Sequence, residues 1–142
     1  MKILIFKNNN KSQTILNKNN ILILIKNIIK QFKKKVIIII KLINKKKILK
    51  YNLIYRGKNK YTNILSFKNN KILNFKEYIG DLIIYNKKKN IFNFNFIHNI
   101  IHSILHLFNF KHLNVYEKKQ MEILEIEILN NFGYNNPYYI IN

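Results

Sequence analysis

The chain contains four histidines, and all of them lie in one fifteen-residue stretch: His98, His102, His106 and His112. A separation of four residues places His102 and His106 one turn apart on the same face of a helix, where two imidazoles can bind one zinc ion. His112 can reach the same ion only if the chain leaves the helix after about Phe108 and turns back. Asn109 stands at the required turn, and asparagine tolerates the left-handed backbone conformation that ends many helices.

Three histidine ligands leave one coordination position open for water, which is the arrangement of catalytic rather than structural zinc sites. His98, His102 and His106 together span about 12 Å of helix, so they cannot all bind one ion. We therefore expect His102, His106 and His112 to be the ligands, and His98 to lie in the core or behind the ligands. The alternative is that these histidines are hydrogen-bonded core residues on an apolar helix face, without a metal.

The elements that must position these histidines follow from the hydrophobic pattern. It predicts strands at 1–6, 36–41, 63–67 and 80–85, and a polar loop at 68–78. Helices are expected from Ser12 to about Phe32, from Asn44 to about Tyr55, from about Asn93 to Phe108 and over about Tyr116–Asn131. The buried face of the first helix should include Ile15, Leu16, Ile23, Ile28 and Ile29.

The sequence shows no internal repeat and no linker. It therefore predicts one α+β domain over residues 1–142, in which helices pack on a small mixed sheet. The three-histidine site would lie on a helix and the turn that follows it.

The chain is strongly basic, with 26 lysine and arginine residues, 6 acidic residues and a net charge of +20. Such a surface attracts polyanions, either RNA or an anionic membrane. An AT-rich genome, as in a reduced endosymbiont or an organelle, would also raise the lysine content, so charge alone names no partner. The longest apolar runs, 21–25 and 36–40, are far shorter than the roughly 20 residues that span a bilayer. Because the chain has no cysteine, a disulfide scaffold or a thiolate metal site is excluded.

The acidic residues are few: Glu77, Asp81, Glu117, Glu122, Glu125 and Glu127. Glu122, Glu125 and Glu127 cannot all face the same side of the last helix, so a solvated face is the expected role for most of them. Zinc proteases of the H-E-x-x-H type need a glutamate directly after the first histidine as general base. Ser103 occupies that position here, which argues against peptide hydrolysis even though the third histidine has the spacing of the metzincins.

Arg56 is the only arginine, among 25 lysines. Codon drift toward lysine would remove arginine wherever lysine suffices. The retention of Arg56 therefore suggests that a planar group with two donors is needed, such as one that binds a phosphate. The alternative is an ordinary surface charge.

Three segments carry motifs in a definite order: 52–67 (NLIYRGKNKYTNILSF), 80–84 (GDLII) and 101–112 (IHSILHLFNFKH). They resemble the motifs L-N-x-x-Y-R-g-K-d-x-P-T-D-V-L-S-F, G-D-I-v-I and H-G-x-L-H-L-x-G-y-D-H of the YbeY single-strand endoribonucleases. The order and separations match from about Val36 to the C-terminus. The sequence departs from the family pattern at five positions, none of them a proposed ligand: Ser103 and Asn109 replace glycine, Lys111 and Asn63 replace aspartate, and Tyr61 replaces proline.

This resemblance implies a metal-dependent endoribonuclease with Zn²⁺ as cofactor and Arg56, His102, His106 and His112 as catalytic residues. Bound zinc would lower the pKa of its water toward about 7, so that no carboxylate base is needed. Arg56 would neutralise charge on the phosphoryl oxygens.

The resemblance also implies a substrate and partners. The substrate would be single-stranded RNA, especially the 3′ end of small-subunit (16S-type) ribosomal RNA, with a further role in ribosome quality control. The small ribosomal subunit and a ribosome-associated GTPase would be partners, no membrane would be involved, and the location would be the cytoplasm or an organelle stroma. One alternative is a basic RNA- or ribosome-binding protein whose zinc site is structural or degenerate. A metalloprotease is the other alternative, and Ser103 argues against it.

Overall fold

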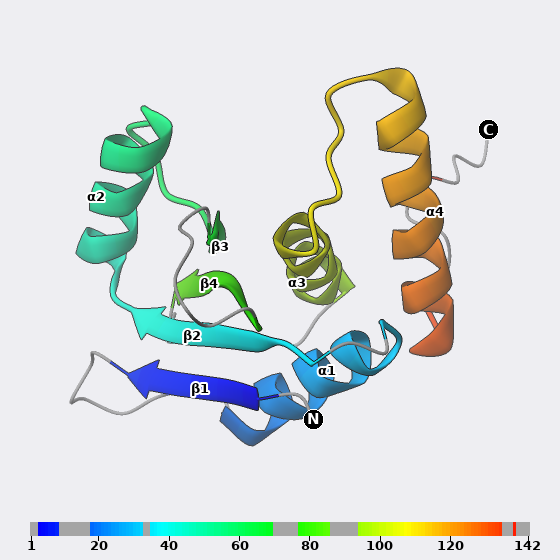
Figure 1. Ribbon diagram of the computed structural model, residues 1–142. Helices are drawn as coiled ribbons and strands as arrows, with labels where there is room; N and C mark the ends of the chain where they lie inside the picture. Colours follow the sequence, from blue (N-terminus) through cyan, green and yellow to red (C-terminus); the bar gives the residue numbers. More distant parts are fainter. Residues whose placement is uncertain are drawn as a thin grey trace.

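The computed structural model of the protein describes residues 3–8, 18–32, 35–69, 77–85, 94–134 and 138. Along the chain the elements are β1 (Ile3–Asn8), α1 (Lys18–Lys30), β2 (Ile37–Ile43), α2 (Lys45–Arg56), β3 (Ile64–Lys68), β4 (Tyr78–Tyr85), α3 (Phe94–Leu107) and α4 (Val115–Asn131) (Figure 1). Within these residues, every helix falls short of the length and apolar character that crossing a bilayer requires.

The strands form one mixed sheet in the order β1-β2-β4-β3. β1, β2 and β4 run parallel, and β3 pairs antiparallel with β4, so β1 and β3 are the edge strands. The predicted α+β class with a small mixed sheet is confirmed. β2 and β4 are longer than predicted, because their parallel pairing runs from Ile37 opposite Tyr78 to Ile43 opposite Tyr85. Of the loop predicted at 68–78, residues 70–76 lie outside the described residues.

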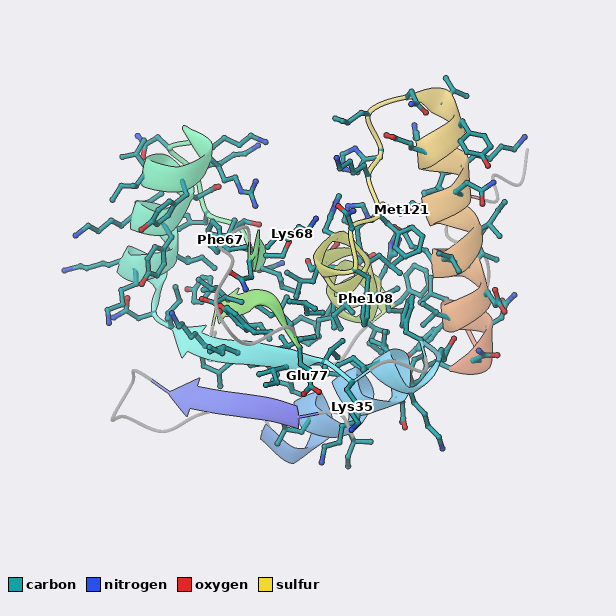
Figure 2. The ribbon with its side chains drawn as sticks, viewed as in Figure 1. Lys35, Phe67, Lys68, Glu77, Phe108 and Met121 are labelled. Atoms are coloured by element: carbon teal, nitrogen blue, oxygen red, sulfur yellow. The ribbon has the colours of Figure 1, made fainter. Side chains whose placement is uncertain are left out.

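Helices α1 and α3 contribute to the core on one face of the sheet, and α4 packs on α3 (Figure 1). Met121 of α4 is buried and is directed toward α3 (Figure 2). The buried stripe of α1 follows the 3.6-residue period of a helix: Ile21, Leu24, Ile25, Ile28 and Ile29. The prediction that Ile23 is buried is wrong, because this side chain lies off the stripe and is 57% exposed. The predicted positions of Ser12, Ile15 and Leu16 lie outside the described residues.

The opposite face of the sheet carries α2. Its buried Ile48 packs in a second apolar cluster with Ile43, Leu65 and Ile83. Successive side chains of a strand point to opposite faces, which is why these residues alternate with those of the main core. The helix begins where the Asn44 side chain accepts a hydrogen bond from the Lys47 backbone N–H at 2.9 Å.

Gly57 ends α2 in the left-handed conformation, and the buried Asn52 then holds the following segment against the helix. The Asn52 side-chain amide donates to the Lys60 carbonyl at 2.8 Å. The chain therefore returns along α2 into β3, and Arg56, in the last turn of the helix, lies beside that strand.

Gly80 of β4 lets the end of α3 approach the sheet closely. A Cβ atom at this position would lie 2.3 Å from the Phe67 carbonyl oxygen and 2.7 Å from Cδ2 of Leu107, and φ is +154°. Only glycine fits this close contact without displacing β3 or α3. Since Leu107 directly follows His106, this contact also fixes how closely the His106 end of α3 packs on the sheet.

We expect Gly80→Ala to lower the free energy of unfolding by about 2–3 kcal/mol, because it adds both a steric clash and a strained backbone conformation. Urea denaturation followed by circular dichroism would measure the change. Gly133→Ala is the matched control, since Gly133 also has a positive φ of 84° but has no atom near its missing Cβ. It should cost about 1 kcal/mol. Equal losses in the two variants would mean that the contact with Phe67 and Leu107 does not constrain the structure.

Candidate metal centre

Helix α3 is buried along one side and carries His102 and His106 at the margin of that buried side, where both are partly exposed. The helix ends as predicted. Asn109 has φ +75°, the Asn109 N–H donates to the His106 carbonyl at 3.0 Å, and the Phe110 N–H donates to the Leu105 carbonyl at 3.0 Å. This left-handed turn reverses the chain and brings His112 back toward the helix.

The side chains of His102, His106 and His112 converge. One ring nitrogen of each lies within 4.8 Å of those of the other two. The Nε2 atoms of His102 and His106 are 3.0 Å apart. The ring centroid of His112 lies 5.6 Å from that of His102 and 4.9 Å from that of His106. The predicted convergence is confirmed, and its dimensions suit three imidazoles around one ion with metal–nitrogen bonds of about 2 Å.

The other ring nitrogens of two of these histidines already have acceptors. Nδ1 of His106 donates to the Phe110 carbonyl at 3.1 Å, and Nδ1 of His102 donates to Oε1 of Glu125 at 2.5 Å. A proton fixed on Nδ1 leaves the Nε2 lone pair available to bind a metal. Histidines that bind a metal usually make such a hydrogen bond with their other ring nitrogen. Burial lowers the pKa of His106, as do the neighbouring charges of His102, His112 and Arg56, and these effects outweigh the hydrogen bond to Phe110. The lowered pKa favours the neutral form of His106, which is the form that binds a metal, and the set of three imidazoles fits a zinc ion.

Glu125 of α4 is the residue that the sequence pattern failed to identify. The expectation of a solvated face is wrong for it, because its side chain is only 1% exposed. Its Oε1 accepts from His102, and its Oε2 contacts Nε2 of His98 at 2.8 Å and the hydroxyl of Tyr138. Burial alone would raise the pKa of Glu125, but hydrogen bonds from His102, Tyr138 and His98 together bring it below its usual value. His98 therefore lies outside the three-histidine group and contacts the same carboxylate as His102.

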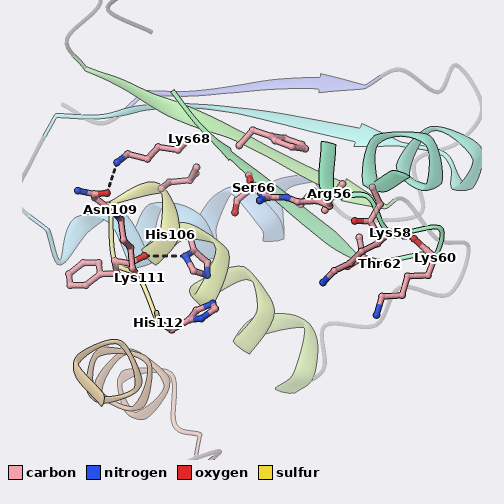
Figure 3. A pocket seen from close by; sticks show the side chains of 15 residues that line it. Arg56, Lys58, Lys60, Thr62, Ser66, Lys68, His106, Asn109, Lys111 and His112 are labelled. Carbon is pink, nitrogen blue, oxygen red and sulfur yellow. Dashed lines mark hydrogen bonds between the residues drawn. The ribbon is translucent and has the colours of Figure 1, made fainter. Parts of the chain in front are cut away.

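A cleft of about 840 Å³ opens in front of the histidines (Figure 3). His106 and His112 line it, as do the polar side chains of Asn52, Thr62, Ser66 and Asn109. Its cationic lining residues are Arg56, Lys58, Lys60, Lys68 and Lys111. No carboxylate is among the described residues that line this cleft. In Figure 3, Lys58 and Lys60 lie toward one end, and Lys68 and Lys111 toward the other.

Arg56 lines the same cleft as His106 and His112. Its Nη2 donates to the Ser66 carbonyl at 2.6 Å, and its guanidinium carbon lies 5.2 Å from the centre of the Phe67 ring. The side chain is thus held against β3 by a hydrogen bond and a cation–π contact. A guanidinium has five N–H donors, so further donors remain for a phosphate in the cleft.

Asp81, the single acidic residue of the three motifs, serves a different part of the molecule. It pairs with Lys41 at 3.4 Å and accepts a hydrogen bond from Tyr78. It does not line the cleft.

The turn at Asn109 offers a test of how the third histidine is placed. We expect Asn109→Ala to lower the free energy of unfolding by about 1 kcal/mol, because an alanine pays the steric cost of the left-handed conformation. Asn109→Gly should change it by less than about 0.5 kcal/mol, since glycine adopts a positive φ freely. Both variants remove the contact between Lys68 Nζ and Asn109 Oδ1. The difference between their free energies of unfolding therefore reports the cost of the left-handed backbone conformation alone. Thermal and urea denaturation would measure the stability of both variants. Equal losses of stability would mean that the positive φ of residue 109 does not determine which residue is tolerated there.

Comparison with known proteins adds an independent line of evidence. A family model described as "Endoribonuclease YbeY" matches residues 5–133. The chain belongs to the YbeY family. A YbeY endoribonuclease of Wigglesworthia glossinidia brevipalpis is 41% identical over 129 residues, which cover 81% of this chain and 82% of the relative. One from Buchnera aphidicola subsp. Baizongia pistaciae is 38% identical over 111 residues, 71% of each chain.

The fold also resembles that of a solved structure. The solution structure of a Thermotoga maritima protein superposes with a TM-score of 0.51 at 16% identity, over 97% of this chain and 100% of that one. This likeness supports the fold. YbeY membership supports an endoribonuclease role, and hence a nuclease hydrolase that acts on RNA.

Proposed function

We propose that the chain is a zinc-dependent, single-strand-specific endoribonuclease, formed as one domain by residues 1–142. Its substrate would be the 3′ region of small-subunit ribosomal RNA, and it would also act in ribosome quality control. The proposed metal ligands are His102, His106 and His112, and Arg56 is the fourth proposed catalytic residue.

One observation carries this proposal: three converging imidazoles beside a cleft with five cationic side chains and, among its described lining residues, no carboxylate. A cationic cleft attracts a polyanion, and the phosphates of a nucleic acid are the natural partners of lysine and arginine. Cations toward both ends of the cleft would contact phosphates on both sides of the bond to be cut. A peptide substrate offers no such charge, and Ser103, which follows the first ligand, cannot serve as a protease base.

The residues of the chain divide the work in this proposal. Lys58, Lys60, Lys68 and Lys111 bind the RNA backbone through its phosphates. Arg56, held by Ser66 and Phe67, donates to the phosphoryl oxygens on which negative charge grows in the transition state. The Nδ1 contacts of His102 and His106 hold two ligand rings in place before the substrate arrives. A zinc ion in the site would supply Lewis acidity and a nucleophilic water at neutral pH.

The wider setting is part of the same proposal. An enzyme that trims ribosomal RNA works on the small ribosomal subunit, and a ribosome-associated GTPase is a further proposed partner. The proposed compartment is the cytoplasm of a bacterium or reduced endosymbiont, or an organelle stroma.

The proposal is tested by metal analysis of the purified protein together with a cleavage assay. We expect about one zinc per chain, cleavage of an unstructured RNA, and no cleavage of the same sequence when it is annealed to its complement. A chelator should stop the reaction, and added Zn²⁺ should restore it. If the zinc-loaded protein binds the RNA but never cuts it, the alternative of a basic RNA- or ribosome-binding protein with a structural or degenerate zinc site is correct.

A further inference from the structure

Glu125 is a buried carboxylate on α4, and its surroundings account for its burial. At 1% exposure, an unpaired carboxylate would cost several kcal/mol. Both oxygens are occupied instead. Oε1 lies 2.5 Å from Nδ1 of His102, while Oε2 contacts Nε2 of His98 at 2.8 Å and the Tyr138 hydroxyl. The carboxylate is therefore bound from two sides and cannot rotate without breaking these contacts.

The contact with His102 determines which nitrogen of that ring carries the proton. An ionised carboxylate can only accept, so the proton of a neutral His102 lies on Nδ1. Nε2 is then unprotonated, and it is the atom 3.0 Å from Nε2 of His106. The Phe110 carbonyl has the same effect on His106, but as a neutral acceptor. Glu125 adds a full negative charge behind the ligand, which makes the imidazole a better donor to a cation.

Glu125 lies beside a different cavity from the one that contains Arg56. It does not line the Arg56 cleft. It borders a smaller cavity of about 320 Å³, which His102 and His112 also line, together with Met121 and Glu122. Among the three proposed ligands, His102 is the one to which Glu125 is hydrogen-bonded, so we expect Glu125 to act on the metal centre through His102.

We propose that Glu125 is a positioning residue of the metal centre, which fixes the Nδ1-protonated form and the orientation of His102. Metal affinity thereby depends on the packing of α4 against α3, although α4 contributes no proposed ligand. His98, the histidine left over from the ligand set, holds the second oxygen of the same carboxylate. This inference rests on the proposed zinc site.

The test measures zinc affinity of the metal-free, full-length protein by competition with a chromophoric chelator. Glu125→Gln keeps the size of the side chain and removes its charge, and should weaken zinc binding by about 10–100-fold. Glu127→Gln is the matched control. It removes the same charge from the same helix at an exposed position and should change the affinity by less than about threefold, because exposed charges are screened. Circular dichroism would confirm that both variants fold.

A second measurement is made on the unchanged protein and does not depend on whether Glu125→Gln folds. In the metal-free, unchanged protein, ¹⁵N NMR of the histidine rings should show His102 with its proton on Nδ1, and His102→Gln would assign the signals. A proton on Nε2, or equal zinc affinity of Glu125→Gln and the unchanged protein, would overturn the inference. If Glu125→Gln does not fold, the NMR result decides. If the unchanged protein binds no zinc, the proposed function fails and this inference fails with it. If the unchanged protein and Glu125→Gln bind zinc equally well, only the inference is overturned.

Discussion

His106→Ala should abolish measurable RNA cleavage and weaken zinc binding by more than about a hundredfold. Loss of an outer partner of a ligand already costs about 10–100-fold, and His106 is a proposed ligand itself. Its Nε2 lies 3.0 Å from that of His102, so its removal opens one side of the site. Zinc titration and a single-stranded RNA cleavage assay on the same preparation would measure both effects.

The fold should survive this substitution. The hydrogen bond from His106 to the Phe110 carbonyl contributes only about 1 kcal/mol. Asn99→Ala, at an exposed position of α3, is the control and should bind zinc and cut RNA like the unchanged protein. If His106→Ala retains full zinc affinity, the ion binds elsewhere and the three-histidine site is not the metal centre.

Arg56→Lys should impair RNA cleavage far more than RNA binding. Lysine keeps the charge, so the attraction that depends on counterion release persists. It lacks the planar pair of donors, and it cannot stack on Phe67 while it also donates to Ser66 as Arg56 does. Loss of one well-placed transition-state donor costs on the order of 3 kcal/mol, roughly a hundredfold or more in rate. Binding, which is spread over several lysines, should weaken by less than about tenfold.

Both quantities must be measured on one single-stranded RNA at one salt concentration. Lys58→Gln should give the opposite pattern, because it removes a proposed phosphate contact of the same cleft. It should weaken binding, reduce cleavage at low RNA concentration in proportion, and lower the salt dependence of binding by about one ion. If Arg56→Lys behaves like Lys58→Gln, Arg56 is one more basic contact and not a catalytic residue.

The convergence of His102, His106 and His112 could be predicted because its information is local in the sequence. The spacing of His102 and His106 depends only on the helical repeat, and Asn109 marks the turn that returns His112. The order of strands and helices was also predictable, since each has its own hydrophobic period. Ile23 shows the limit of this approach, because an apolar residue in a helix need not lie on its buried stripe.

The role of Glu125 could not be predicted, because its partners are distant in sequence. His102 and His98 precede it by 23 and 27 residues on another helix. In the sequence, Glu125 stands between two other glutamates of an outer helix, and nothing there distinguishes a buried carboxylate from a solvated one. Only the packing of α4 on α3 makes the difference, and that packing is set by tertiary contacts. The contact between Arg56 and the Ser66 carbonyl spans only ten residues, but it too depends on a tertiary feature, the placement of β3 beside the end of α2.

The position of β3 at the edge of the sheet has a consequence for solubility. An edge strand presents backbone groups to which an extended segment of another molecule can pair, and this is a common start of aggregation. Arg56 occupies the Ser66 carbonyl, and β3 ends at the charged Lys68. A second molecule would have to displace the guanidinium before it could add a strand there. The proposed catalytic arginine would thus also hinder strand pairing at this edge, so we expect variants that lack it to aggregate more readily, and aggregation must be measured before a loss of cleavage is assigned to chemistry.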